Sequence, residues 1–429
     1  SSAASDVYKR QVCGPTVYDY LHIGNARPAV VFDVLATFLR HRYEKVIFVS
    51  NITDIDDKIN AAAKQNNESI TTLTERFTQA CEQDFEALGV APPDVRPKAT
   101  EHIPEIIDMI ENLIEGGFAY ESEGHVLFHV PSDPSYGSLS KRSLEDMLAG
   151  ARVEIASYKK DPKDFILWKP SSSDLPGWDS PWGRGRPGWH IECSAMIQKH
   201  LGGHIDIHGG GSDLTFPHHE NEAAQSRCAN RSKDYVNYWL HNGMITLANE
   251  KMSKSLGNIL GIRTLLQQHS GEVLRYALLS GHYRSSLSWS DDLIQQAKSS
   301  LDSLYQTLRD HSEKALLGSV PIGSSLECDH EFELALCDDL NTPKALAALH
   351  RISDELRNAE DDESALRKRN DLIQAGSLLG LLQDDPEAYF KRSVGSETGD
   401  ALSESKIESF IEERRRARAC LLYTSDAAD

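Results

Sequence analysis

Long apolar runs are absent from this chain of 429 residues, since no stretch approaches the roughly 18 apolar residues that span a bilayer. Cysteine is sparse, with seven residues, which excludes a disulfide scaffold and favours a reducing, cytoplasmic setting. Positive charge is also in deficit, and the net charge of −20 argues against indiscriminate nucleic-acid binding, although a local basic face remains compatible with it. The composition is otherwise that of a globular protein with about two or three domains.

The two ends of the chain are unlike the sequence between them. One short DNA sequence, which resembles a transposon-type sequencing adapter, encodes residues 1–11 on one strand and residues 420–429 on the other. We therefore expect both segments to be non-native, to lie outside the fold and to be dispensable for activity and stability. The native part, 12–419, would then be a fragment that lacks part of a strand before Cys13.

The first half of the chain predicts alternating helices and strands. An apolar helix is expected over 26–42, with Pro28 in its first turn, and the β-branched and aromatic run that follows predicts a strand. A later strand runs into three glycines and places His204, Asp206 and His208 on one face. We therefore predict an α/β domain.

The sequence pattern changes at about Ser290, where helical periodicity begins. Leucines and alanines recur there at helical spacing, and Asn341-Thr342-Pro343 is a typical helix start. Between the two halves, 93–189 is rich in Pro, Gly and Trp and contains short strand candidates, which indicates an insertion. We predict a helical bundle appended to the α/β domain.

A first phosphate-binding candidate lies in "YDYLHIGNARP". A strand, a loop and a helix start put His22, Gly24 and Asn25 beside free N–H groups at the positive end of a helix. Glycine there lets the backbone approach a nucleotide closely. Taken alone, such a tetrapeptide is more often a simple turn.

A second candidate is "EKMSKSLGN". Its residues Lys251, Ser253 and Lys254 suit a loop that neutralises a polyphosphate, although a solvated basic loop fits equally well. Two phosphate-binding elements more than 200 residues apart predict one ATP, with Mg²⁺, held across a sheet crevice. The sequence has neither a Walker loop nor a GxGxxG fingerprint, which excludes P-loop and NAD-binding readings.

Four residues form a candidate metal site. His218 and Glu222 stand at i and i+4, so a helix projects them from one face. Thiolates from Cys13 and Cys193 would complete a set of two sulfurs, one nitrogen and one oxygen that suits zinc. Spacing alone fits two ordinary buried cysteines just as well.

The two phosphate-binding elements resemble the HIGH and KMSKS signatures of class I aminoacyl-tRNA synthetases. The phrases "CGPTVYDYLHIGNARP", "NITDIDDKI", "GRPGWHIECSAM" and "DIHGGGSDLTFPHHENEAAQS" resemble the cysteinyl-tRNA synthetases in particular, and the resemblance runs from Cys13 to about Leu382. One departure is Asn25, where the HIGH signature ends in histidine. Asparagine can donate a hydrogen bond but cannot become cationic, which makes its phosphate role less secure than that of His22.

The resemblance implies a Rossmann-like α/β catalytic domain with a connective insertion and a C-terminal helical bundle. The implied organisation is a non-native segment 1–11, catalytic halves at 12–92 and 190–245 around the insertion 93–189, a KMSKS and stem-contact region 246–290, a truncated bundle 291–419 and a non-native segment 420–429. Position-by-position matching implies zinc at Cys13, Cys193, His218 and Glu222, a substrate wall at Trp189, a weaker substrate contact at Asp213, and ATP phosphate contact at Lys254.

The implied function is ligation of cysteine to tRNA(Cys) through cysteinyl-adenylate, with one zinc ion per chain selecting the thiolate. The expected partners are tRNA(Cys), cysteine and ATP, with no membrane, and the expected state is a monomer. Basic runs at 367–369 and 414–416 are either solvated helix faces or tRNA contacts. Two alternatives are the cysteine ligase of mycothiol synthesis, with an amino sugar–inositol acceptor, and an inactive tRNA-binding paralogue.

Overall fold

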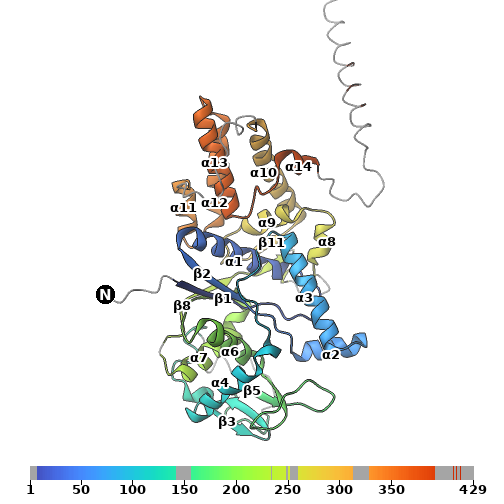
Figure 1. The fold of residues 1–429 in the computed structure, drawn as a ribbon, viewed down its shortest axis with the longest axis vertical. Coiled ribbons are helices and arrows are strands. Elements are labelled where there is room, and N and C mark those ends of the chain that lie inside the picture. Colours follow the sequence, from blue (N-terminus) through green and yellow to red (C-terminus); the bar gives the residue numbers. More distant parts are fainter. Residues whose placement is uncertain are drawn as a thin grey trace, which may run out of the picture.

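The computed structural model describes residues 7–141, 156–232, 234–247, 250–251, 259–312 and 328–391, together with 409, 412 and 416. Figure 1 shows a helical bundle at one end, a sheet in the middle and a smaller sheet with its helices at the other end. No helix among the described residues is long and apolar enough to cross a membrane.

The central sheet has four parallel strands in the order β2-β1-β7-β8. They are β1 (Val7–Val12), β2 (Lys45–Ser50), β7 (Ile205–Gly211) and β8 (Val236–Asn242). The predicted strands around KVIFVS and HIDIHGGG are thus confirmed as β2 and β7. Because the chain order is not the spatial order, the carboxyl ends of neighbouring strands open a crevice of the kind that binds nucleotides in α/β folds.

Strand β1 corrects one prediction. Residues 7–11 lie inside the sheet, where Val7 pairs with Lys45 and Arg10 with both Phe48 and Ile207. The expectation that this segment stays outside the fold is therefore wrong for 7–11, whereas its dispensability for activity and stability stays a prediction. The physical reason is that a parallel sheet pairs strands through backbone groups, which every non-proline residue supplies.

Helix α1 (Ile23–Arg42) packs on the central sheet and confirms the predicted apolar helix. It begins three residues earlier than predicted, so Pro28 lies in the second turn rather than the first. Arg27 is fully buried and donates to the carbonyl oxygens of Gly243 (2.7 Å) and His282 (3.1 Å). This arginine therefore fixes the helix to the segment that enters the third sheet.

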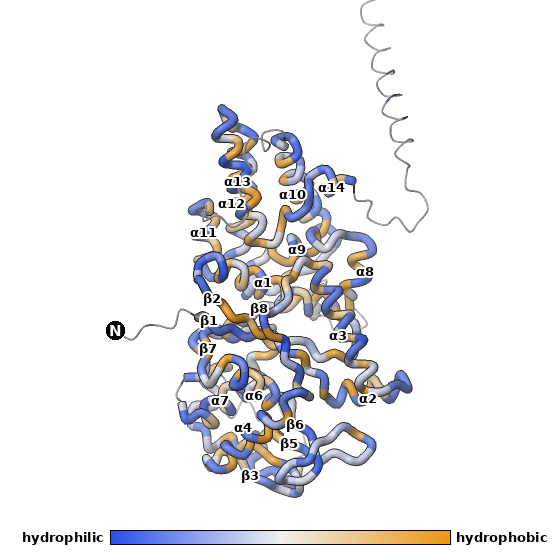
Figure 2. The backbone as a smooth tube through the Cα atoms, in the orientation of Figure 1, coloured by the Kyte–Doolittle hydropathy of each residue, from blue (hydrophilic) through white to orange (hydrophobic). Residues whose placement is uncertain are grey.

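The remaining elements include a connective part with its own sheet, a third small sheet, and the helices of the bundle. The connective part has an antiparallel sheet in the order β3-β4-β5-β6 and the third sheet has the order β10-β9-β11. Figure 2 shows apolar segments concentrated at the central sheet and between the bundle helices. The bounds are α2 (Asp57–Asn66), α3 (Ile70–Ala87), α4 (Ile103–Glu115), β3 (Ala119–Ser122), β4 (His125–Phe128), β5 (Phe165–Pro170), β6 (Gly185–Pro187), α6 (Trp189–Leu201), α7 (Glu220–Asn230), β9 (Ile245–Leu247), β10 (Glu250–Lys251), α8 (Ile262–Leu266), α9 (Gly271–Leu279), β11 (Leu287–Trp289), α10 (Asp291–Asp310), α11 (His330–Cys337), α12 (Thr342–Arg357), α13 (Asp362–Leu378) and α14 (Pro386–Lys391), with single 3₁₀ or π turns at 99–102, 130–132, 212–214 and 215–219.

The predicted bundle start is confirmed, because the Asn341 side chain accepts from the Lys344 backbone and caps α12. One apolar core runs without interruption from α1 to the bundle helices. At its centre the buried Arg275 of α9 pairs with Asp33 of α1 and donates to the carbonyl oxygens of Leu379 (2.6 Å) and Gly89 (2.8 Å). The bundle is thereby attached to the catalytic part by both apolar and polar contacts.

Candidate functional site

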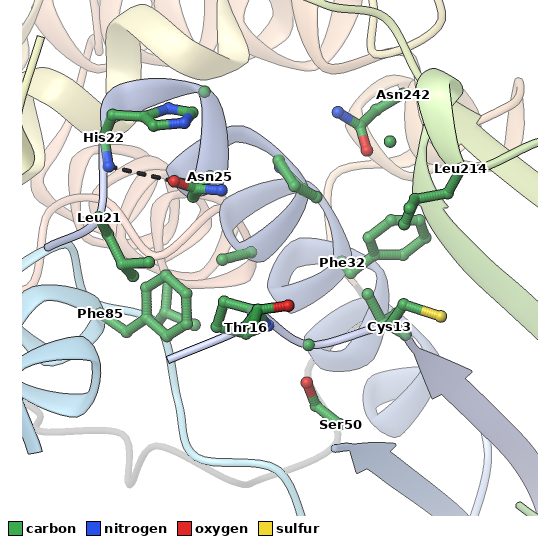
Figure 3. A pocket seen from close by; sticks show the side chains of 18 of the residues that line it. Cys13, Thr16, Leu21, His22, Asn25, Phe32, Ser50, Phe85, Leu214 and Asn242 are labelled. Atoms are coloured by element: carbon green, nitrogen blue, oxygen red, sulfur yellow. Dashed lines mark hydrogen bonds between the residues drawn. The ribbon is translucent and has the colours of Figure 1, made fainter. Parts of the chain in front are cut away.

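A cavity of about 380 Å³ opens at the carboxyl ends of the central strands. Cys13 lies at its floor, His22 and Asn25 lie on one side, and Leu214 and Asn242 lie on the other, as Figure 3 shows. The predicted phosphate-binding loop and the predicted metal ligand Cys13 therefore line one cavity, although they come from different elements.

The loop that contains His22 leads directly into α1. The Asn25 side-chain oxygen accepts the backbone N–H of His22 at 3.1 Å, as the dashed line in Figure 3 shows. This bond is half of a capping box, so the Asn25 carbonyl oxygen serves the helix start. The Asn25 amide nitrogen keeps its donor capacity for a ligand, and Gly24 leaves the helix entrance unobstructed.

Backbone bonds join this loop to the segment that follows the second phosphate-binding candidate. The N–H of Ile23 donates to the carbonyl of Leu260 at 2.9 Å, and the N–H of Ile262 donates to that of Leu21 at 3.1 Å. Lys251 lies in β10, but its side chain, and all of Ser253 and Lys254, fall outside the described residues. Their predicted phosphate contacts therefore stay predictions.

The four predicted metal ligands converge. Ligand atoms of Cys13, Cys193, His218 and Glu222 all lie within 4.8 Å of one another. Cys13 follows β1, Cys193 is on α6, and the other two flank the start of α7, with His218 Nε2 at 2.9 Å from Glu222 Oε1. Donors from elements far apart in sequence thus meet beside the cavity, which Cys13 lines.

The residue after Cys13 explains how the thiol reaches this place. A Cβ on Gly14 would lie 1.6 Å from the carbonyl oxygen of Asn51, so only glycine lets the chain pass. The Asn51 side chain also accepts the Gly14 N–H at 3.2 Å. The turn is therefore held from both sides.

A second donor set was not predicted. Cys13 and Glu222 also lie within 4.8 Å of ligand atoms of His208 and His219. His219 Nε2 is 3.4 Å from the Cys13 sulfur, and His208 Nε2 is 3.6 Å from Glu222 Oε2. The alternation that aimed His208 at one face of β7 was the available signal, whereas nothing in the sequence distinguished His219 from its neighbour His218.

Burial controls the protonation of these groups. It raises the pKa of the Cys13 thiol to about 11. A hydrogen bond with Cys13, and then burial, raise the pKa of Cys193 well above its usual value. Burial alone would lower the pKa of His218, but the charge of Glu222 and bonds to Cys193 and Glu222 outweigh it and raise the value to about 10. Metal binding to this set therefore has to displace protons.

Two further predicted residues line the same cavity. Trp189 begins α6, is 40% exposed, and stacks on the His218 ring with centroids 4.3 Å apart. Asp213, after the triple glycine, is exposed and also lines the cavity. Both residues therefore border the space that the predicted phosphate-binding loop borders.

Comparison with known proteins decides the family. Residues 3–299 match the family described as tRNA synthetases class I (C) catalytic domain, and residues 331–383 match the DALR domain. The chain belongs to the cysteine–tRNA ligase family. A cysteine–tRNA ligase of Xanthomonas campestris pv. campestris is 56% identical over 95% of this chain and 86% of its own length, and one of Saccharophagus degradans is 54% identical over 97% and 88%. The predicted family and fold class are thus confirmed.

Solved structures of other class I enzymes share the fold of this family member. A methionyl-tRNA synthetase of Mycobacterium tuberculosis in complex with methionyl-adenylate superposes with a TM-score of 0.61 at 16% identity, covering 87% of this chain and 89% of that one. A leucyl enzyme of Agrobacterium radiobacter K84, in a ternary complex, gives 0.63 at 11% identity over 94% and 88%. At such identities the likeness establishes architecture alone.

Proposed function

We propose that this member of the cysteine–tRNA ligase family activates cysteine with ATP to cysteinyl-adenylate and transfers the aminoacyl group to the 3′ end of tRNA(Cys). The observation that carries the proposal is the convergence of four donor atoms, of which the one from Cys13 belongs to a residue that lines the same cavity as His22 and Asn25. We further propose that the chain acts as a cytoplasmic monomer.

The donor set fits zinc. Two thiols, an imidazole and a carboxylate are borderline-soft ligands of the kind that bind zinc in proteins. Burial raises the pKa of the Cys13 thiol, and a hydrogen bond with Cys13 together with burial raises the pKa of Cys193, so both thiols are protonated near neutral pH. His218 pairs with Glu222. Both thiols lose their protons when a cation binds, so the set becomes negatively charged only then. A bound zinc ion supplies a position for the substrate thiolate, which the hydroxyl of serine cannot match near neutral pH.

The protein's own residues do the rest. Trp189 closes the cysteine pocket on one side, and Asp213 is available to the substrate ammonium or the ribose. The N–H groups at the start of α1, with His22 and the Asn25 amide, face the triphosphate. Lysines 251 and 254 neutralise charge on the departing pyrophosphate. Positioning and phosphate charge stabilisation therefore account for both steps without a covalent enzyme intermediate.

Cysteine-dependent ATP–pyrophosphate exchange tests this proposal, with serine as the competing substrate and with charging of tRNA compared against charging of an amino sugar–inositol. The mycothiol alternative and the inactive paralogue are disfavoured because the chain aligns with 86% of the length of a cysteine–tRNA ligase. Exchange that proceeds equally with serine would contradict the assigned selectivity.

Replacement of Lys254 by alanine is expected to lower the exchange rate by about a hundredfold while the affinity for cysteine stays within about twofold. The reason is that charge builds on the pyrophosphate only as it leaves, so the lysine acts on the transition state. Exchange kinetics and cysteine titration measure the two effects separately. An equal loss of cysteine affinity would assign Lys254 a structural role instead.

A further inference from the structure

The rim of the active-site cavity carries an exposed aromatic ring that the proposed chemistry does not use. Tyr20 lines the cavity and is 51% exposed. Phe77 of α3 meets it edge to face with centroids 5.1 Å apart, and the Arg263 guanidinium lies 4.9 Å from the ring centroid. Arg263 is itself fixed by Asp84 at 2.8 Å. The ring is thus held in place while half of its surface faces solvent, as in a platform for base stacking.

The same cavity is lined by Lys58, whose side chain makes no ion pair with any other described residue. Lys58 is exposed near the N-terminus of α2, with its ammonium 5.8 Å from the Tyr18 ring centroid. No carboxylate of the described residues lies within ion-pair distance of it. Arg96, in the same cavity wall, is paired with Glu82 at 2.6 Å.

Two acids precede Lys58, and the side chain of neither forms an ion pair with it. The Asp56 carboxylate caps α2 and accepts the backbone N–H of Lys58 at 2.8 Å. Asp57 binds Lys169 at 2.7 Å and Arg186 at 3.0 Å, which fixes α2 to β5 and β6. These ion pairs neutralise the charge of Asp57 and hold the start of the helix in position. Helices α2 and α3 contact each other, and the Tyr20 ring packs on Phe77 of α3, so the lysine and the ring belong to neighbouring parts of the structure.

We propose that Tyr20 and Lys58 bind the unpaired 3′ end of tRNA, Tyr20 by stacking on a base and Lys58 by pairing with a backbone phosphate. An aromatic ring and a lysine without an ion pair among the described residues, both in the lining of one cavity, match a single strand, in which bases and phosphates alternate. The phosphate could also belong to ATP, but the N-terminus of α1 already supplies that site. The inference rests on tRNA being the acceptor.

Steady-state kinetics of variants test the inference. Lys58→Met and Tyr20→Leu are each expected to lower kcat/KM for tRNA by about tenfold, since one phosphate contact or one stacked base is lost. ATP–pyrophosphate exchange should stay within about twofold of wild type in both. Lys58→Arg and Tyr20→Phe keep the charge and the ring and should retain charging. Lys64→Met, in the last turn of α2 and outside the cavity lining, is the matched control.

Direct binding of two tRNA probes locates the contact. Intact tRNA should bind Lys58→Met more weakly than wild type, whereas tRNA trimmed of its unpaired 3′ nucleotides should bind both enzymes equally. The salt dependence of binding intact tRNA should lose about 0.7 in slope. Three outcomes would overturn the inference. Loss of exchange in Lys58→Met would assign the lysine to ATP, and an equal effect on the binding of trimmed tRNA would assign it to the tRNA duplex. Unchanged charging would show that the lysine takes no part in tRNA binding. Absent exchange in the wild type would count against the proposed function instead.

Discussion

Replacement of Cys193 by serine is expected to remove zinc from the protein and to lower cysteine-dependent exchange by at least about a hundredfold. A neutral hydroxyl is a poor zinc ligand, and the remaining donors Cys13, His218 and Glu222 lose the second thiolate that favours zinc over harder cations. Metal analysis of the purified variant measures the first effect, and exchange kinetics measure the second.

The second donor set gives this experiment its control. Because Cys193 belongs to one set and His219 to the other, His219→Asn should retain zinc if the first set is the metal site. Full zinc in Cys193→Ser with loss in His219→Asn would move the site to the second set. Cys228→Ser changes a buried cysteine of α7 that belongs to neither set, and it should leave the zinc content unchanged.

Replacement of Arg10 by methionine is expected to raise the free energy of unfolding by about 3 kcal/mol. Arg10 is fully buried in β1, and none of its guanidinium nitrogens has a hydrogen-bond partner among the described residues. The Phe48 ring, 4.1 Å from the guanidinium, compensates only part of the lost hydration. Methionine keeps the length and fills the same space without a charge. Chemical denaturation followed by circular dichroism measures the gain.

The pH dependence of that gain follows from the same burial. Burial, with a smaller contribution from Arg40, lowers the pKa of Arg10 to about 9 in the folded state. The folded value lies below the unfolded one, so the penalty is complete below about pH 9 and recedes as the pH rises further. Lys9→Met, one residue earlier in β1 and partly exposed, should change stability by less than about 0.5 kcal/mol. A destabilised Arg10→Met would show that the cation is accommodated.

Sequence patterns were sufficient where one residue determines a local structure. Asn341 predicted the start of α12. The family resemblance assigned the four metal-ligand candidates, and the structure brings their ligand atoms within 4.8 Å of one another. Patterns failed where tertiary pairing decides. No periodicity could indicate that residues 7–11 would enter the sheet, since their side chains are untypical of a buried parallel strand.

The site residues that the sequence missed share a property. Tyr20 and Lys58, the residues of the proposed tRNA contact, are ordinary surface types, and only the three-dimensional structure shows which neighbours contact them. His219 became notable only because a neighbouring strand brought Cys13 within 3.4 Å. The sequence predicted the chemistry of individual motifs, whereas contacts between segments far apart in the chain could not be predicted from it.

The contacts of Arg275 have a consequence for cooperativity. The Arg275 guanidinium contacts Asp33, Gly89 and Leu379. A Cβ on Gly380 would lie 2.4 Å from the central carbon of this guanidinium, so the bundle and the catalytic part are closely packed here. A unit that shares one core and one buried ion pair cannot melt in part without exposing an unpaired charge. The two parts, which occupy separate stretches of sequence, should therefore melt in a single calorimetric transition.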